Sequence, residues 1–163
     1  MELTNRDRTV VPARLARLPG YVLARAHVQA HARFQEVLEP LGLTPKSFGV
    51  LIVITESGPL SQAAVGETLL IDRTTMVSLV DDLQRAGYVE RGRNATDRRV
   101  HSLRVTAVGE EALGAAERIA CTLQDELLAG LSADEREQLS ALLGRIAGLS
   151  GASSDRAPSA DLG

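Results

Sequence analysis

The sequence predicts a mainly α-helical fold with one small β-hairpin. Through most of residues 20–149, apolar residues recur every three or four positions, which is the period of an amphipathic helix. Two short segments, 88–93 and 100–105, instead have the pattern of strands on either side of a polar turn. Aromatic residues make up 2% of the chain, so we expect a core of Leu, Val, Ile and Ala packed between helices.

The composition is that of an ordinary single domain. The chain has 163 residues, of which 44% are hydrophobic and 24% charged, and its formal net charge is −3. It contains no run of about 18 apolar residues, and residues 1–7 lack an apolar signal core. We therefore expect a cytoplasmic protein with no membrane partner. The single cysteine, Cys121, excludes an intramolecular disulfide framework and a cysteine-based zinc cluster.

One domain, residues 19–149, is expected between two irregular ends. Residues 1–18 mix charge, proline and small residues without a clear period, which predicts a flexible N-terminal arm. Residues 150–163 are rich in small and polar residues and predict a disordered tail.

The first part of the domain predicts two helices. Apolar residues spaced by threes and fours indicate a helix from about residue 20 to 41, which Pro40 and Gly42 end. A second helix follows Thr44, with Pro45 at its first position. Its run 48–54 is apolar nearly all round, so we expect this helix to be central and buried.

Two more helices follow in close succession. Gly58 and Pro59 end the buried helix, and Ser61 can cap a short helix over about 62–69. Asp72 can cap the next helix, which Gly87 ends. The apolar stripe of this helix leaves its other face polar and consists of Met76, Leu79, Val80 and Leu83.

The hairpin and two further helices complete the domain. The strands 88–93 and 100–105 are joined by a turn at 94–99. Thr106 can cap a long helix. Ser132 and Glu135 have the spacing of a capping box, in which hydroxyl and carboxylate satisfy each other's backbone amides, and they begin the last helix.

Charge is divided unevenly along the chain. Residues 85–104 contain six arginines against two acids, a local balance of +4, whereas residues 110–137 contain eight acids against two arginines, a balance of −6. A basic hairpin after a helix with a polar face is an electrostatic footprint for a polyanion. The alternative is an arginine-rich turn that only faces solvent.

Residues 55–106, in the order helix, break, helix and basic hairpin, have the layout of a winged helix-turn-helix. The DNA major groove admits one helix, whose first turn meets the base edges. The side chains at that turn are Arg73, Thr74, Thr75 and Ser78. Arginine bonds guanine, threonine offers a hydroxyl or methyl group, and an arginine of the hairpin can enter the minor groove.

These residues resemble a known family. The segment 69–91, then Asp97-Arg98-Arg99, then 103–109 is similar to the recognition helix, wing and following helix of the MarR family of bacterial transcription regulators, over about residues 20–148. The resemblance implies a repressor or activator that acts as a homodimer on a pseudo-palindromic double-stranded DNA operator, and we expect a ligand-responsive repressor. The helices 20–41 and 107–149 would form the dimer.

The resemblance also implies roles for the residues of the wing. Arg99 would enter the minor groove, and Asp97 would orient the wing arginine through a charge-assisted hydrogen bond. Arg98, at the tip, would contact phosphate or substitute for Arg99. The sequence departs from the family's helix-turn-helix at Gly66. Since glycine costs about 1 kcal/mol against alanine in a helix interior, we expect the supporting helix to be looser there.

A small aromatic or phenolic anion is the effector class that the resemblance implies. His27 and His31 lie one turn apart on the first helix, with Arg17 and Arg25 near, and cations beside an apolar wall suit an organic carboxylate. Alternatively, both histidines are ordinary helix residues or dimer contacts. The two histidines could also bind a metal ion from one face of the helix, but the sequence offers no evident third ligand to complete such a site. We interpret Cys121 as a packed, inert thiol, with a redox-sensing thiol as the alternative.

No enzyme motif or cofactor-binding fingerprint occurs in the sequence. The rival class is a protein-interaction module whose winged helix no longer binds DNA, or a thiol-sensing or metal-sensing winged-helix module. The basic hairpin favours DNA, because such a module would have no reason to concentrate Arg91, Arg93, Arg98 and Arg99 within nine residues.

Overall fold

The computed structural model of the chain describes residues 11–93 and 101–149. The elements in order are α1 (Ala13–Ala16), α2 (Pro19–Leu38), the 3-10 helix η1 (Glu39–Leu41), α3 (Pro45–Ser57), β1 (Leu60–Ser61), α4 (Gln62–Thr68), α5 (Arg73–Arg85), β2 (Val89–Arg93), β3 (His101–Val105), α6 (Ala107–Leu127) and α7 (Ala133–Ile146). They fall into two compact units, Met1–Gln124 and Asp125–Gly163. The mainly helical class with a small antiparallel sheet is confirmed.

Side-chain caps begin most of the helices where the sequence predicts them. Such caps satisfy backbone N–H groups that have no partner within the helix. The hydroxyl or carboxylate oxygens of the capping residues accept from the backbone N–H three positions on, at Thr44 (3.1 Å), Ser61 (3.2 Å), Asp72 (3.0 Å), Thr106 (3.0 Å) and Ser132 (3.3 Å). The capping box at α7 is complete, since Ser132 N–H donates to Glu135 Oε2 at 2.8 Å.

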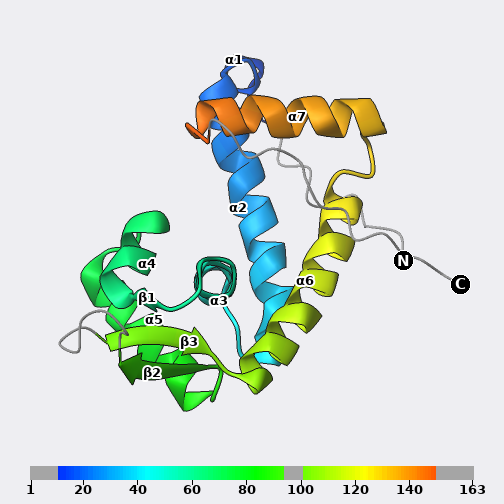
Figure 1. The fold of residues 1–163 in the computed structure, drawn as a ribbon. Coiled ribbons are helices and arrows are strands. Elements are labelled where there is room, and N and C mark those ends of the chain that lie inside the picture. Colours follow the sequence, from blue (N-terminus) through cyan, green and yellow to red (C-terminus); the bar gives the residue numbers. More distant parts are fainter. Residues whose placement is uncertain (1–10, 94–100, 150–163) are drawn as a thin grey trace, which may run out of the picture. The chain divides into compact units, whose positions relative to one another are not determined.

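Helix α3 is the centre of the first unit, as its apolar run predicts. It contacts α2, α4, α5 and β3, and Figure 1 shows it end-on among these elements. Val50 and Leu51 of α3 are fully buried. Phe48 meets Phe34 of α2 edge to face, with ring centroids 5.4 Å apart. This helix is therefore the support against which the two helices of the helix-turn-helix are placed.

The sheet has one strand more than the sequence predicts. The order is β1-β3-β2, with both pairs antiparallel, and Leu60 of β1 lies opposite Leu103 of β3. Strand β1 has two residues, which is too short for a visible alternation of apolar and polar side chains. Strand β1 directly precedes α4 and pairs with β3 of the hairpin, so backbone hydrogen bonds join the wing to the helix-turn-helix.

The N-terminal boundaries differ from the prediction. Part of the expected flexible arm, Ala13–Ala16, forms the short helix α1. The first long helix ends at Leu38 rather than at residue 41, and Glu39–Leu41 continues as a 3-10 turn that Gly42 closes at φ +64°. Pro40 explains the change, because proline has no N–H to continue the α-helical pattern.

The expectation that Gly66 loosens its helix is wrong. Helix α4 is regular from Gln62 to Thr68, and Gly66 is buried. A Cβ at this position would lie 3.1 Å from the carbonyl oxygen of Ile71 and 3.4 Å from Cγ of Met76. Glycine is therefore present because α4 and α5 approach each other closely, and this approach sets the geometry of the helix-turn-helix.

The second unit contains α7 and the residues before it. Arg136 pairs with Asp125 at 2.9 Å and donates from Nε to the carbonyl oxygen of Leu131 at 3.2 Å. Near the end of the unit Leu142, Ile146 and Leu149 are exposed. Leu142 and Ile146 lie on α7 and Leu149 lies just after it, and an uncovered apolar set of this size indicates a surface that another chain covers.

The described residues contain no single helix that is long and apolar enough to span a membrane. The segments Pro19–Leu41 and Pro45–Ser57 meet the length and composition criteria together, but they are bent by 71° relative to each other.

We predict that Gly109→Ala destabilises the fold strongly. A Cβ there would collide with the carbonyl oxygen of Tyr88 and would lie 2.8 Å from Cγ1 of Val105, and overpacking against backbone costs about 1–3 kcal/mol or more. Gly114→Ala on the same helix is the matched control. Its Cβ would meet only Arg118 Nη1 at 3.7 Å, so we expect it to gain about 0.5–1 kcal/mol. Urea unfolding compares both variants with the parent, and equal midpoints for the two would contradict the packing role of Gly109.

Candidate nucleic-acid interface

Helix α5 has one buried face and one exposed face. Met76, Val80 and Leu83 are at most 2% exposed and hold the helix against the core. The predicted contact residues Arg73, Thr74 and Ser78 are exposed on the other side. Arg73 has no hydrogen-bond or ion-pair partner within residues 11–93 and 101–149. The first two turns of α5 therefore present an exposed guanidinium and two hydroxyl groups to an incoming ligand.

Thr75, the fourth residue predicted on this turn, has a different local role. It is half-buried, its hydroxyl donates to Asp72 Oδ2 at 2.6 Å, and its backbone N–H donates to Asp72 Oδ1 at 3.0 Å. These two hydrogen bonds, the side-chain one first, hold the pKa of Asp72 below its ordinary value of 3.8. Thr75 and Asp72 thus fix the start of the helix, and the Thr75 hydroxyl is already engaged.

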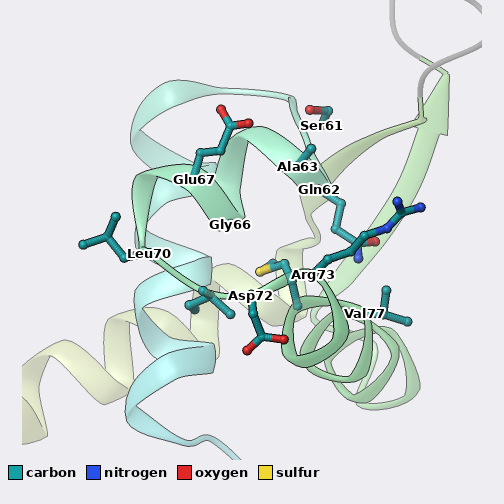
Figure 2. Close-up of a pocket in the computed structure, with 11 residues that line it drawn as sticks. Ser61, Gln62, Ala63, Gly66, Glu67, Leu70, Asp72, Arg73 and Val77 are labelled. Carbon is teal, nitrogen blue, oxygen red and sulfur yellow. The ribbon is translucent and has the colours of Figure 1, made fainter.

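A groove of about 1040 Å³ lies between α4 and α5 and opens beside the first turn of α5. Gln62 of α4 and Arg73 and Val77 of α5 all line this groove, and Figure 2 shows Arg73 and Val77 on the same side of α5. Sequence reasoning did not single out Gln62 or Val77. The position of Val77 on the polar face of its helix was the available signal, because an apolar residue breaks the pattern there.

The turn between α4 and α5 contains a strained residue. Leu70 has φ +53°, and it is the one residue other than glycine with a positive φ within the described ranges. The left-handed conformation costs about 1–2 kcal/mol for a residue with a Cβ. The side chain of Leu70 is 94% exposed, so it gains almost no burial in return. The hydrogen bond from Ile71 N–H to the Gly66 carbonyl oxygen at 2.9 Å holds this turn closed.

The net positive charge around residues 85–104 is smaller than the balance of +4 counted from the sequence, because acids of α5 pair with two of the arginines. Arg91 of β2 pairs with Asp81 of α5, and Arg85 pairs with Asp82, each at 2.8 Å. Both aspartates lie just before the segment over which the charge was summed. Two of the six arginines in residues 85–104 are therefore paired with acids of α5, the recognition helix. The Asp81–Arg91 pair also joins that helix to the wing.

The wing residues expected to contact DNA, Asp97, Arg98 and Arg99, lie outside the described residues. The strands on either side are described, and β2 and β3 pair in register from Val89 opposite Val105 to Arg93 opposite His101. The hairpin predicted at this place is confirmed. Arg104 of β3 is exposed and adds a further cation near the wing.

The candidate effector residues are only partly brought together. His27 and His31 are both exposed on α2, and their ring centroids lie 5.6 Å apart. Arg25 is half-buried on the same helix, whereas Arg17 lies at the end of α1. Within the part of the chain that the structure describes, no hydrogen bond or ion pair joins these histidines to either arginine.

Two other expectations can be compared with the structure. The thiol of Cys121 is exposed rather than packed, because its position on α6 faces away from the buried residues Leu113, Ala116 and Leu123. Among the described residues no group of three or more His, Cys, Asp or Glu side chains is arranged to hold a metal ion.

The same architecture occurs in known proteins. A family model described as MarR family matches residues 41–100. A protein of Thauera aromatica described as a putative transcriptional regulatory protein for the hcr operon is 33% identical over 128 residues, which cover 78% of this chain and 77% of that protein. This chain belongs to the MarR family. The Escherichia coli transcriptional regulator HosA is 31% identical over 109 residues, covering 67% of this chain and 79% of HosA.

Solved MarR-family structures agree in fold and show what those proteins bind. The transcriptional repressor CouR bound to a 23-mer DNA duplex matches with a TM-score of 0.77 at 34% identity, covering 82% of this chain and 94% of CouR. CouR bound to p-coumaroyl-CoA matches with a TM-score of 0.75 at 30% identity, covering 85% and 97%. A mutant of Escherichia coli MarR complexed with operator DNA gives 0.71 at 26%, covering 78% and 91%.

This MarR-family chain is therefore a DNA-binding transcriptional regulator and not an enzyme. The rival interpretation, a winged helix that serves only protein interaction or sensing, is not favoured by these relatives. The exposed Arg73 and the exposed hydroxyls on α5 lie where a winged helix meets the major groove.

We predict that the stabilising effect of the Asp72 cap is lost in acid. The pKa of Asp72 is lowered in the folded chain, so its carboxylate stabilises the fold above the unfolded value of 3.8 and ceases to do so as the pH falls through the lower folded value. In Asp72→Asn the amide oxygen caps the helix without titrating. Unfolding free energies measured across this pH range should therefore fall less for Asp72→Asn than for the parent, and parallel curves would contradict the assignment.

We predict that Asp81→Asn makes DNA binding more sensitive to salt. The change releases Arg91, and one more cation available to phosphate should steepen the slope of log affinity against log salt by about one per protomer. Asp125→Asn is the control, because it breaks the exposed Asp125–Arg136 pair of similar length in the other unit. Fluorescence anisotropy over a salt series gives the slopes. An unchanged slope for Asp81→Asn would show that Arg91 does not reach DNA.

Proposed function

We propose that this MarR-family chain is a ligand-responsive repressor that binds a pseudo-palindromic operator as a homodimer. The exposed face of α5, with the Arg73 guanidinium at its first turn, carries this proposal. DNA binding by this face requires a cytoplasmic protein, so we propose that location as well.

The DNA contacts would come from α5 and from the wing. Arg73, Thr74 and Ser78 would meet base edges or phosphates, while Thr75 would hold the helix start. In the wing, Asp97 would orient Arg99 toward the minor groove, and Arg98 would contact phosphate. Two recognition helices related by a two-fold axis would occupy successive major grooves, about 34 Å apart.

The dimer would be formed by the long helices outside the winged helix. We propose residues 19–149 as the functional domain, with helices 20–41 and 107–149 as the dimer-forming parts. In the first unit Leu18, Val22 and Val28 are exposed, and in the second unit Leu142 and Ile146 are exposed. Each set is apolar surface that a second copy of the chain would cover.

The effector would be an aromatic carboxylic acid or its coenzyme A thioester. The similarity to CouR, which is known in complex with p-coumaroyl-CoA, supports this class. The exposed pair His27 and His31, with Arg25 on the same helix and Arg17 before it, would supply cationic and donor groups for a carboxylate or for the phosphates of coenzyme A.

DNA binding and dimer formation are tested first with the full chain. Selection from a pool of random duplexes should enrich a sequence with two inverted half-sites about 10–10.5 base pairs apart, centre to centre. Sedimentation velocity of the chain alone should give a dimer. Enrichment of a single half-site, or a monomer at micromolar concentration, would contradict the proposal.

The effector class is tested on the selected duplex. We expect p-coumaroyl-CoA or p-coumarate to release the DNA, and acetyl-CoA, which lacks the aromatic ring, to leave the complex intact. Replacing both His27 and His31 with Ala should raise the effector concentration needed for release about tenfold or more, since hydrogen bonds to charged groups contribute about 1.5–3 kcal/mol. Gln29→Ala, at an exposed position of the same helix, is the matched control. Release by acetyl-CoA, or no release by either aromatic compound, would contradict this effector class.

A further inference from the structure

We propose that Val77 is a specificity-determining residue that contacts the methyl group of one thymine in each half-site. This inference rests on the proposed operator binding and goes beyond it, because it names one base and the group on that base that is recognised. Arginine and hydroxyl groups alone leave open which bases the middle of the recognition helix selects.

The burial of Val77 is unlike that of the other apolar residues in the middle of α5. Met76 and Val80 are at most 1% exposed, whereas the side chain of Val77 is 41% exposed. It lies one helical turn after Arg73, on the wall of the groove between α4 and α5. Figure 2 shows both side chains on the same side of α5. The helix therefore presents an isopropyl group beside an exposed guanidinium.

The charges of the residues one turn before and one turn after Val77 indicate what kind of molecule Val77 contacts. Arg73 precedes it by one turn, and Asp81 follows it by one turn and is paired with Arg91 at 2.8 Å. Along this face of α5 an exposed cation, Arg73, is therefore followed by the apolar Val77 and then by Asp81, whose charge is neutralised by Arg91. A cation at the start suits DNA, while the pairing of Asp81 removes the repulsion that an unpaired carboxylate would cause near phosphates.

A thymine methyl group is the apolar feature that the major groove offers. It projects into the groove from C5, and cytosine lacks it, so contact with an aliphatic side chain distinguishes T from C. On the exposed face of α5, Val77 is the one apolar side chain among polar neighbours, and its isopropyl group suits contact with a group of this size. A protein partner would instead be expected to need a broader apolar patch than Val77 supplies.

The size of the effect follows from the area of one methyl group. Burying one such group against Val77 corresponds to about fourfold in affinity per half-site. Replacing the thymine by deoxyuridine removes only that methyl group and leaves the base pair and its hydrogen-bonding groups unchanged. The substitution therefore isolates the proposed contact.

The experiment uses the full chain and the duplex obtained by selection from a random pool. Each thymine of the half-site is replaced by deoxyuridine, one position at a time and symmetrically in both half-sites, and affinities are measured by fluorescence anisotropy. We expect one position at which the parent loses about fourfold per half-site. Val77→Ala should bind the thymine and deoxyuridine duplexes equally well at that position.

Two further variants separate the contact from changes in folding. Val77→Thr keeps one methyl group at the same place and should retain part of the sensitivity to deoxyuridine. Leu15→Ala shortens an exposed aliphatic side chain of α1, outside the helix-turn-helix and outside the helices proposed to form the dimer, and should behave like the parent. Thermal unfolding of each variant checks that the fold is intact.

The outcomes distinguish this inference from the function on which it rests. If selection enriches no duplex, operator binding and the role of Val77 both fail. If a duplex is enriched but no thymine in it is sensitive to loss of its methyl group, or if Val77→Ala keeps the full sensitivity, only the role of Val77 is overturned. An enriched half-site without thymine would overturn it in the same way.

Discussion

The burial of α3 is the constraint on which the rest of the first unit depends. Helix α3 contacts α2, α4, α5 and β3, so each of these elements buries part of its apolar side by packing on it. Because α4 and α5 rest on the same support, they can also approach each other, and Gly66 permits the contact with Ile71 and Met76. The angle at which the recognition helix is presented follows from this packing.

The proposed DNA-binding surface of α5 combines exposed side chains with side chains that already have a hydrogen-bond or ion-pair partner. Asp72 and Thr75 satisfy the start of α5, which leaves Arg73, Thr74, Val77 and Ser78 exposed. Asp81 and Asp82 hold two arginines close to the same helix. A surface on which acids neutralise some of the cations binds phosphate less strongly without regard to sequence, so contacts with individual bases contribute a larger share of recognition.

Much of the fold could be predicted because helix starts are local. A capping residue and its partner lie three positions apart, so Thr44, Ser61, Asp72, Thr106 and Ser132 could be identified without knowledge of the tertiary structure. Strand β1 could not, because two residues have no period and their pairing with β3 joins positions about forty residues apart. The exposure of Cys121 was missed for a related reason, since a small apolar side chain fits either face of an amphipathic helix.

The sequence by itself determined the mainly helical class, the order of the longer helices and of the two hairpin strands, the helix starts and the first turn of the recognition helix, all of which depend on residues within one or two turns of each other. Only the tertiary structure decided which arginines are paired, because Asp81 and Arg91 lie on different elements and meet when the wing packs beside α5. It also decided the meaning of Gly66. A helix considered alone is weakened by glycine, whereas here a Cβ would lie 3.1 Å from the carbonyl oxygen of Ile71, a tight contact that glycine avoids.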